Sequence, residues 1–261
     1  MKAMTAAFAA AILLSAVSVS MAEIRTEVVE YRHGDAVLEG YMAYDDSVKG
    51  KRPGVLVVHE WMGHNPYVRK RAEGLARLGY VAFALDMYGK GVRAKDSKEA
   101  ASLAAIYKGD RGLMRARAAA GLGVLARHPM VDPARLAAIG YCFGGTTVLE
   151  LARAGADLRA VVSFHGGLDT PSAEDARNIR GKVLVLHGGD DPFVPPAQVA
   201  AFQEEMRKGG VDWQFVAYGG AVHSFTNPEA GGDNSKGAAY NERADRRSWE
   251  AMKAFFAETL K

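Results

Sequence analysis

The chain contains one cysteine, Cys142, and the residues around it are those expected around a catalytic nucleophile. Cys142 is central in the run IGYCFGG at 139–145, which follows an apolar segment and precedes a segment typical of a helix. A strand, a glycine-flanked corner and a helix form a nucleophile elbow, here G-x-C-x-G. Gly140 and Gly144 leave room for a strained backbone, and the helix start favours a thiolate. A buried structural cysteine would suit the same run, so partner residues must decide between the two.

Two further polar residues follow predicted buried strands and would complete this chemistry. Asp191 and His223 come after Cys142 in the order nucleophile, acid, base that is typical of α/β-hydrolases. In such a triad the histidine withdraws the proton of the nucleophile and the carboxylate orients the imidazole. Asp191 alone could cap a turn, and His223 is one of seven histidines. Their common position at strand ends favours a Cys142–His223–Asp191 triad, with Asp190 as the alternative acid.

The run HEWMGH at 59–64 resembles a zinc motif only superficially. His59 and His64 are five residues apart and fall at a strand end and in a loop, so they cannot share the helix face that H-E-x-x-H requires. We therefore expect no metal and no cofactor. His165 and His187 follow buried strands and are expected to satisfy backbone groups near the site.

The elements that must position these residues alternate between strands and helices. Strands are predicted at 26–32, 37–44, 54–59, 80–85, 136–139, 158–164, 182–186 and 213–217. Helices are predicted at 66–78, 97–127 (in two parts), 196–208 and 239–260, and a turn at 132–133. This pattern predicts one α/β domain over residues 23–261, with a mostly parallel sheet, an N-terminal antiparallel hairpin and helices on both faces. Ligands of such sheets bind beyond the carboxyl ends of the strands.

Residues 1–22 have the pattern of a secretory signal peptide. Lys2 precedes an apolar run at 6–19, and small residues at Ser20 and Ala22 precede the expected cleavage point. The run is too short to span a membrane, so we expect a periplasmic or secreted protein without a membrane span. A single cysteine leaves no internal disulfide to form.

Composition limits the possible partners. The formal net charge is +3 over 261 residues, without a basic patch, so we expect no nucleic-acid partner. We expect a monomer that acts on a small molecule.

Several runs together resemble the dienelactone hydrolases (carboxymethylenebutenolidases), which are cysteine members of the α/β-hydrolase fold. The resemblance extends over nearly all of residues 23–261 and is carried by GYCFGG at 140–145, DPFVP at 191–195, AVHSF at 221–225 and HEW at 59–61. It implies that Cys142, Asp191 and His223 form the catalytic triad. It also implies that the backbone amides of Trp61 and Phe143 form the oxyanion hole.

The resemblance also implies roles that composition does not suggest. The residue matching Glu60 holds the resting thiol as a neutral, shielded partner in the family, and substrate displaces it. Dienelactone-cleaving members carry an arginine four residues after the catalytic histidine, where this chain has Asn227. Arg111 and Lys98 are candidates for a second substrate-binding cation. Apart from the resemblance, the aromatic residues Trp61, Tyr88, Phe143 and Phe225 are candidates for an apolar pocket wall, with a place in the core as the alternative. Loss of a charged clamp relaxes the demand for a substrate carboxylate.

The sequence therefore predicts a hydrolase of carboxylic esters or lactones that forms an acyl-thioester. The alternatives are a non-catalytic ligand-binding or thiol redox-sensing protein on the same fold, and a thioesterase or acyltransferase. A redox sensor needs neither the acid nor the base, so their presence favours the enzyme.

Overall fold

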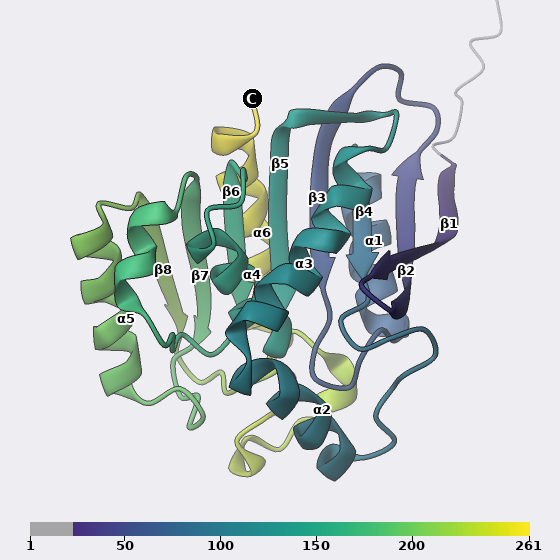
Figure 1. Cartoon of the computed structure of the whole chain (residues 1–261). Coiled ribbons are helices and arrows are strands. Elements are labelled where there is room, and N and C mark those ends of the chain that lie inside the picture. The colour runs from purple at the N-terminus through teal and green to yellow at the C-terminus, as the bar shows by residue number, and fades with distance from the viewer. Residues whose placement is uncertain (1–22) are drawn as a thin grey trace, which may run out of the picture.

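The computed structural model describes residues 23–261, and the predicted signal peptide at 1–22 lies outside them. An eight-stranded sheet with the order β1-β2-β4-β3-β5-β6-β7-β8 forms the centre of the molecule (Figure 1). β1 (Ile24–His33) and β2 (Ala36–Asp45) form the predicted antiparallel hairpin, and β2 pairs antiparallel with β4. All other neighbours in the sheet pair in parallel, which confirms the predicted α/β-hydrolase architecture.

The remaining elements alternate along the chain. The other strands are β3 (Arg52–Val58), β4 (Val81–Leu85), β5 (Val131–Tyr141), β6 (Ala160–Phe164), β7 (Lys182–Gly188) and β8 (Trp213–Tyr218). The α-helices are α1 (Pro66–Arg77), α2 (Ser97–Gly109), α3 (Arg111–Ala126), α4 (Phe143–Arg153), α5 (Pro196–Gly209) and α6 (Glu242–Thr259). Short 3₁₀ turns are η1 (Ala173–Asn178), η2 (Pro228–Ala230) and η3 (Asn234–Lys236).

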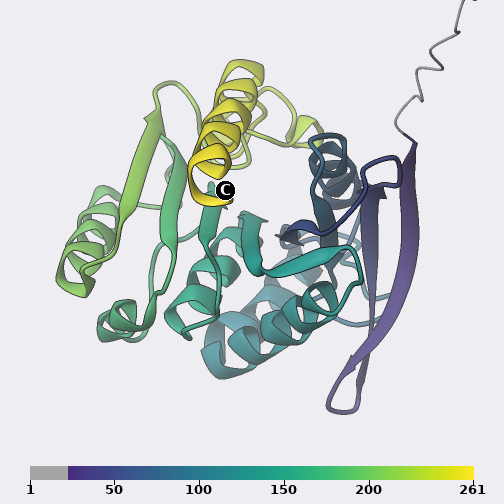
Figure 2. The same cartoon turned by 90° about the horizontal axis from the view of Figure 1, so that it is seen from above.

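The sheet separates two hydrophobic cores, one on each face. α1 and α6 cover one face, and the other helices cover the opposite face (Figure 2). Side chains of a strand point alternately to the two faces, so Leu56 and Val58 of β3 enter one core while Val55 and Val57 enter the other. Burial on both sides explains the continuous apolar runs of the central strands.

Two predicted boundaries are wrong, for local reasons. The segment 132–133, predicted as a turn, lies inside β5, which begins at Val131. The strand accommodates these turn residues in a β-bulge, where its register against β3 shifts between Pro53 and Gly54. The last helix begins at Glu242 rather than at residue 239, because the side chain of Asn241 caps it.

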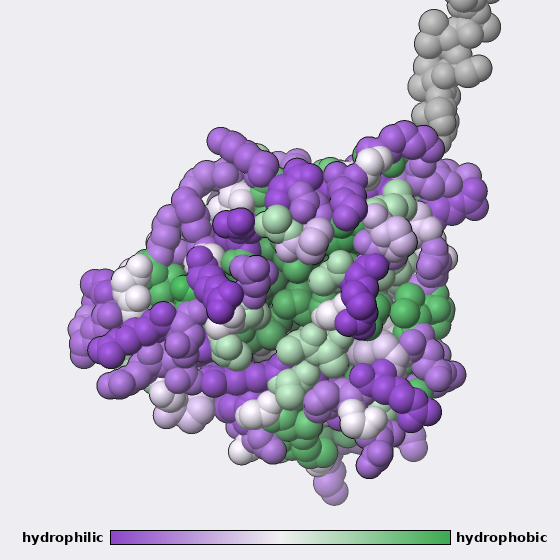
Figure 3. All heavy atoms as spheres, turned by 45° about the horizontal axis from the view of Figure 1, so that its top comes forward, coloured by the Kyte–Doolittle hydropathy of each residue, from purple (hydrophilic) through white to green (hydrophobic). Residues whose placement is uncertain are grey.

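Within residues 23–261, no helix is both long and apolar enough to cross a membrane. Figure 3 brings the end of the sheet opposite the carboxyl ends of its parallel strands toward the viewer. Hydrophilic residues dominate that surface, with apolar residues between them.

Candidate active site

The backbone at Cys142 has the strained conformation that an elbow requires. Cys142 lies between β5 and α4 with φ +53° and ψ −114°, in a region that non-glycine residues rarely adopt. A Cβ atom at Gly140 would overlap the carbonyl of Gly144, and one at Gly144 would overlap the carbonyl of Val58. The two glycines of the G-x-C-x-G run are therefore required by direct backbone packing.

The three residues predicted as a triad are joined by hydrogen bonds. His223 Nε2 lies 3.0 Å from Cys142 Sγ, and His223 Nδ1 donates to Asp191 Oδ2 at 2.8 Å. Asp190, the alternative acid, instead accepts a hydrogen bond from the Gly220 amide at the surface. The geometry thus places Asp191, and not Asp190, against the imidazole.

Charges in this cluster act strongly on His223. Burial lowers its pKa, but the neighbouring Cys142 and the hydrogen-bonded Asp191 outweigh burial and raise the pKa to about 10. The imidazole therefore favours its protonated form at neutral pH, beside the sulfur.

The segment that follows His223 returns to the histidine and holds its backbone. The His223 amide donates to Gly237 O at 3.1 Å, and the Ala239 amide donates to His223 O at 3.0 Å. Ser224, the next residue, has φ +55°, a left-handed conformation that non-glycine residues rarely adopt, and it also lines the cavity. Phe193 lies edge-on to the imidazole, with ring centroids 5.5 Å apart. The base is therefore fixed through its backbone as well as through its side chain.

His165 supports the nucleophile from behind. Its Nδ1 accepts from the Cys142 amide at 3.2 Å, and its Nε2 donates to Thr226 Oγ1 at 2.7 Å. Burial holds the pKa of His165 well below its usual value, so the ring is neutral and these contacts fix its tautomer. The expectation that His165 satisfies a backbone group near the site is confirmed.

Glu60 is buried beside this cluster but is bonded to a different residue. Asn227 Nδ2 donates to Glu60 Oε2 at 2.6 Å, while Oε1 has no hydrogen-bond partner within residues 23–261. Burial raises the pKa of Glu60, against the smaller opposing effect of the Asn227 hydrogen bond. No hydrogen bond joins Glu60 to Cys142 in this part of the chain, since the thiol faces His223.

A cavity of about 450 Å³ opens onto Cys142 and His223. Its walls are apolar at Trp61, Phe143 and Phe193. Lys108 of α2 and Lys236 of η3 supply positive charge to the lining. The volume and the mixed lining suit a small organic substrate.

The weaker substrate-binding candidates lie outside this lining. Arg111 is paired with Asp169, which does line the cavity, at 2.6 Å. Phe225 is fully buried and packs against His165, because the turn at Ser224 directs it into the core. Asn227 binds Glu60 instead of facing the cavity.

Sequence reasoning missed several cavity residues, among them Phe193, Lys108 and Lys236. Phe193 belongs to the DPFVP run used to find the acid, and its 59% exposure marks it as unusual for an aromatic residue. Lys108 lies in the two-helix segment at 97–127, whose charged residues look alike in sequence. Lys98, the other residue considered there, does not line the cavity.

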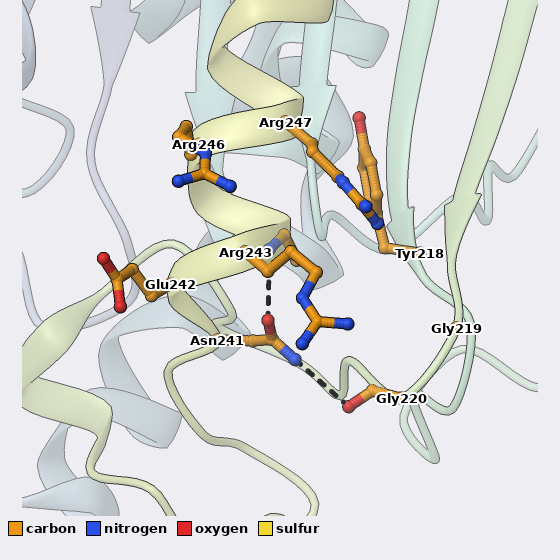
Figure 4. Close-up of a pocket in the computed structure, with 9 residues that line it drawn as sticks. Tyr218, Gly219, Gly220, Asn241, Glu242, Arg243, Arg246 and Arg247 are labelled. Carbon is orange, nitrogen blue, oxygen red and sulfur yellow. Dashed lines mark hydrogen bonds between the residues drawn. The ribbon is translucent and has the colours of Figure 1, made fainter.

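A second hollow of about 500 Å³ lies between the loop after β8 and the start of α6 (Figure 4). The side chains of Arg243, Arg246 and Arg247 surround it, and Asn241 donates to Gly220 O at 3.3 Å across its floor. It contains no member of the triad.

Within residues 23–261, no group of three or more histidine, cysteine or carboxylate side chains is arranged to hold a metal ion.

Comparison with known proteins identifies this arrangement. A model of the dienelactone hydrolase family matches residues 38–260, nearly all of the described chain. The chain belongs to the dienelactone hydrolase family. It is accordingly a hydrolase of the kind that acts on esters or lactones.

Three relatives that align with this dienelactone hydrolase family member over almost their whole length support the assignment. A protein of Synechocystis sp., provisionally named carboxymethylenebutenolidase, is 27% identical over 92% of this chain and 99% of its own. The solved structure named m3DLH is 44% identical, with a TM-score of 0.88, over 91% of this chain and 99% of its own. P91, a dienelactone hydrolase-like promiscuous phosphotriesterase from metagenomic libraries, is also 44% identical, with a TM-score of 0.87 and the same coverage.

Proposed function

We propose that this hydrolase cleaves carboxylic esters or lactones through covalent catalysis by Cys142. The thiolate attacks the carbonyl carbon, a C–S bond forms, and the carbonyl electrons move to oxygen. The amides of Trp61 and Phe143 stabilise that oxyanion, an effect typically worth about 3–4 kcal/mol per donor. Collapse expels the alkoxide, which takes the proton of the His223 imidazolium and leaves an acyl-thioester.

Deacylation follows with the same residues. Neutral His223 takes one proton from water, and the resulting hydroxide attacks the thioester carbon. Collapse expels the Cys142 thiolate and releases the carboxylic acid, which restores the thiolate–imidazolium pair. Asp191 keeps the imidazole oriented throughout. The observation that supports this scheme most is the continuous contact from Asp191 through His223 to Sγ, at 2.8 and 3.0 Å.

The cavity favours substrates that do not depend on a carboxylate clamp. Asn227 stands where dienelactone-cleaving members carry arginine, and Arg111 is engaged with Asp169. The apolar walls suit an uncharged acyl or alcohol group, while Lys108 and Lys236 supply the positive charge of the lining in place of that arginine.

Parallel assays of p-nitrophenyl acetate and the dienelactone, on wild type and Cys142→Ala, test both points. We expect the wild type to turn over both substrates, with little preference for the dienelactone, and the variant to lose both activities. Retained turnover by Cys142→Ala would remove the thiol from the mechanism.

No turnover by a folded, reduced wild type, together with reversible oxidation of the thiol, would favour the redox-sensing alternative. Acyl transfer to added thiols or alcohols would identify an acyltransferase, and faster cleavage of thioesters a thioesterase.

Phosphotriester hydrolysis is a second candidate activity, favoured by the similarity to P91 and by the uncharged aromatic walls of the cavity. The thiolate would displace an aryloxide from phosphorus, and water would then cleave the P–S bond. Turnover of diethyl p-nitrophenyl phosphate that disappears in Cys142→Ala would support it, and turnover that persists would exclude this route.

We also propose that the protein is exported after cleavage near Glu23 and is monomeric. The sequence pattern at 1–22 supports the export. N-terminal sequencing of protein recovered from the periplasm or medium, with light scattering, tests both statements.

A further inference from the structure

His59 is a fully buried histidine that belongs neither to the triad nor to the lining of the cavity. It lies two positions before Trp61, whose amide is expected in the oxyanion hole. Its ring forms two hydrogen bonds, both to the backbone: Nδ1 lies 2.6 Å from Glu60 O, and Nε2 lies 3.2 Å from the Met87 amide nitrogen. The ring therefore ties its own loop to the segment that follows β4.

These two partners leave only one tautomer for the ring. A carbonyl oxygen can only accept a hydrogen bond and an amide can only donate one, so the proton is on Nδ1 and Nε2 is the acceptor. Burial lowers the pKa of His59 below its ordinary value, so the ring is neutral and keeps this single proton. The one proton of His59 is therefore committed to the carbonyl of Glu60.

The carbonyl of Glu60 belongs to the same peptide unit as the amide of Trp61. Residues 23–261 contain no cis peptide bond, and in a trans peptide the C=O and N–H bonds point in opposite directions. His59 holds the carbonyl on the buried side, so the Trp61 amide points the other way. No acceptor within residues 23–261 takes that amide proton, while Trp61 itself lines the catalytic cavity together with Cys142.

Other contacts restrain this peptide unit less directly. The Gly63 amide also donates to Glu60 O, at the longer distance of 3.2 Å. The Tyr88 hydroxyl donates to Trp61 O at 2.9 Å, but that carbonyl belongs to the next peptide unit. Without the imidazole, only the longer Gly63 bond would hold the direction of the Glu60 carbonyl.

His59 also contacts the second residue of the expected oxyanion hole. Its ring packs against that of Phe143, with centroids 6.0 Å apart and an angle of 23° between the planes. Phe143 is the first residue of α4, and the amides in the first turn of a helix have no acceptor within that helix. One buried side chain thus contacts the structure around both amides that would face the oxyanion.

We propose that His59 is a positioning residue of the reaction: its Nδ1 proton holds the peptide between Glu60 and Trp61 so that the Trp61 amide is aimed at the oxyanion before substrate binds. Donors that are oriented in advance stabilise the developing charge without having to reorganise during the reaction. The inference rests on the proposed function, because it concerns the oxyanion of that reaction.

Two substitutions separate the roles of the two ring nitrogens. The amide of asparagine can take the place of Nδ1, so His59→Asn keeps the donor to Glu60 O. The longer glutamine reaches the place of Nε2, so His59→Gln keeps only the acceptor for the Met87 amide. With p-nitrophenyl acetate we expect His59→Asn to stay within about threefold of the wild-type kcat. We expect kcat to fall about 10²-fold in His59→Gln, the low end of the loss when an oxyanion-hole donor is removed, with KM changed less than about threefold.

Two controls separate aim of the amide from damage to the site. Iodoacetamide reacts with Cys142 at its methylene carbon and forms no oxyanion, so the alkylation rate should be the same in wild type and in both variants. His64→Asn is the matched control for loss of a buried histidine, because it removes the bond between His64 Nε2 and Ala84 O, outside the expected oxyanion hole. We expect His64→Asn to keep kcat within about threefold of wild type.

A further variant keeps the test independent of a single substitution that might not fold. His59→Leu removes both ring bonds without adding a polar group and should show the same fall in kcat as His59→Gln. Wild-type kcat in His59→Gln would overturn the proposal. Equal losses of kcat in His59→Asn and His59→Gln, or an alkylation rate that falls in step with kcat, would also overturn it, because either result would show a packing role alone.

Crystal structures of wild type, His59→Asn and His59→Gln keep this inference separate from the proposed function. We expect the peptide between Glu60 and Trp61 to keep its direction in His59→Asn and to rotate in His59→Gln. An unrotated peptide in His59→Gln would contradict the role of His59. A wild type that does not turn over esters would contradict the proposed function, while the direction of this peptide would still decide what His59 holds.

Discussion

Two hollows of similar size are lined by opposite ends of the segment 218–223: Tyr218 to Gly220 line one, and His223 lines the other. The catalytic cavity, of about 450 Å³, contains a half-buried thiol and imidazole joined to a buried carboxylate, whereas the hollow of about 500 Å³ is surrounded by exposed arginines of α6. Burial lowers the pKa of His223, but its contacts with Cys142 and Asp191 outweigh burial and raise it to about 10. No ion pair engages Arg243, Arg246 or Arg247 among the described residues. Volume therefore does not distinguish the two regions. The difference lies in titratable groups that are desolvated together, because only such groups change each other's reactivity.

The two regions are nevertheless physically connected. Gly220 forms part of the arginine-lined hollow, and its amide donates to Asp190, the neighbour of the catalytic acid. Substitutions in each hollow can therefore test whether only the catalytic cavity affects turnover, as the difference between their side chains suggests.

The largest effect is expected from the nucleophile. Cys142→Ala should lower kcat by about 10⁶-fold for p-nitrophenyl acetate, since loss of a triad nucleophile removes the covalent route. Steady-state assays at matched protein concentration, with thermal unfolding as the folding control, measure this. Activity within tenfold of wild type would mean that the cavity does not use the thiol.

The next largest effect should separate two adjacent carboxylates. Asp191→Asn should lower kcat about 10⁴-fold, because the amide favours the wrong imidazole tautomer. Asp190→Asn changes only a surface bond to Gly220 and should stay within about threefold of wild type, as expected for an exposed hydrogen bond. Equal losses of kcat in the two variants would mean that Asp191 is not the sole catalytic carboxylate.

A smaller effect is expected in the pH dependence of stability. The pKa of His223 is raised above its ordinary value of about 6.5. Protonated His223 therefore stabilises the folded protein fully below about pH 6.5, and this stabilisation is lost as the pH rises through about 10. The difference in Tm between wild type and Cys142→Ala should therefore shrink from pH 7 to pH 10. A constant difference over that range would argue against a charged pair in the free protein.

The smallest effect is expected in the second hollow. Replacing Arg243, Arg246 and Arg247 together by alanine should change kcat/KM for p-nitrophenyl acetate less than about twofold, since surface substitutions away from a site have small effects. The same variant should leave the alkylation rate of Cys142 unchanged. A large loss in either measurement would show that the arginine-lined hollow acts on the triad through Gly220.

The parts of the site that could be predicted are those fixed by local sequence. The elbow at Cys142 follows from flanking glycines and a strand–helix boundary, and Asp191 and His223 follow from their positions after buried strands. These signals come from residues close together in the chain, so they can be read from a single sequence.

The contact between Glu60 and Asn227 could not be predicted in this way. The two residues are 167 positions apart, and their meeting depends on the path of the segment after Ser224.

The start of β5 was mispredicted for a different reason. Asp132 accepts from the Ala134 amide as a local turn does, but the pairing with β3 includes Val131 and Asp132 and resumes at Leu136, so the strand continues past the turn.

The two backbone bonds on either side of His223 have a consequence for how substrate preference can diversify. The segment 226–236 leaves from one side of the base and returns to the other, where the Gly237 carbonyl and the Ala239 amide pair with the histidine itself. The returning end of the segment is thereby hydrogen-bonded to the catalytic residue, while Lys236 within it lines the cavity. Thr226 and Asn227 are tied to His165 and Glu60, so the part of the segment that can vary in length and composition without moving the base is 230–236.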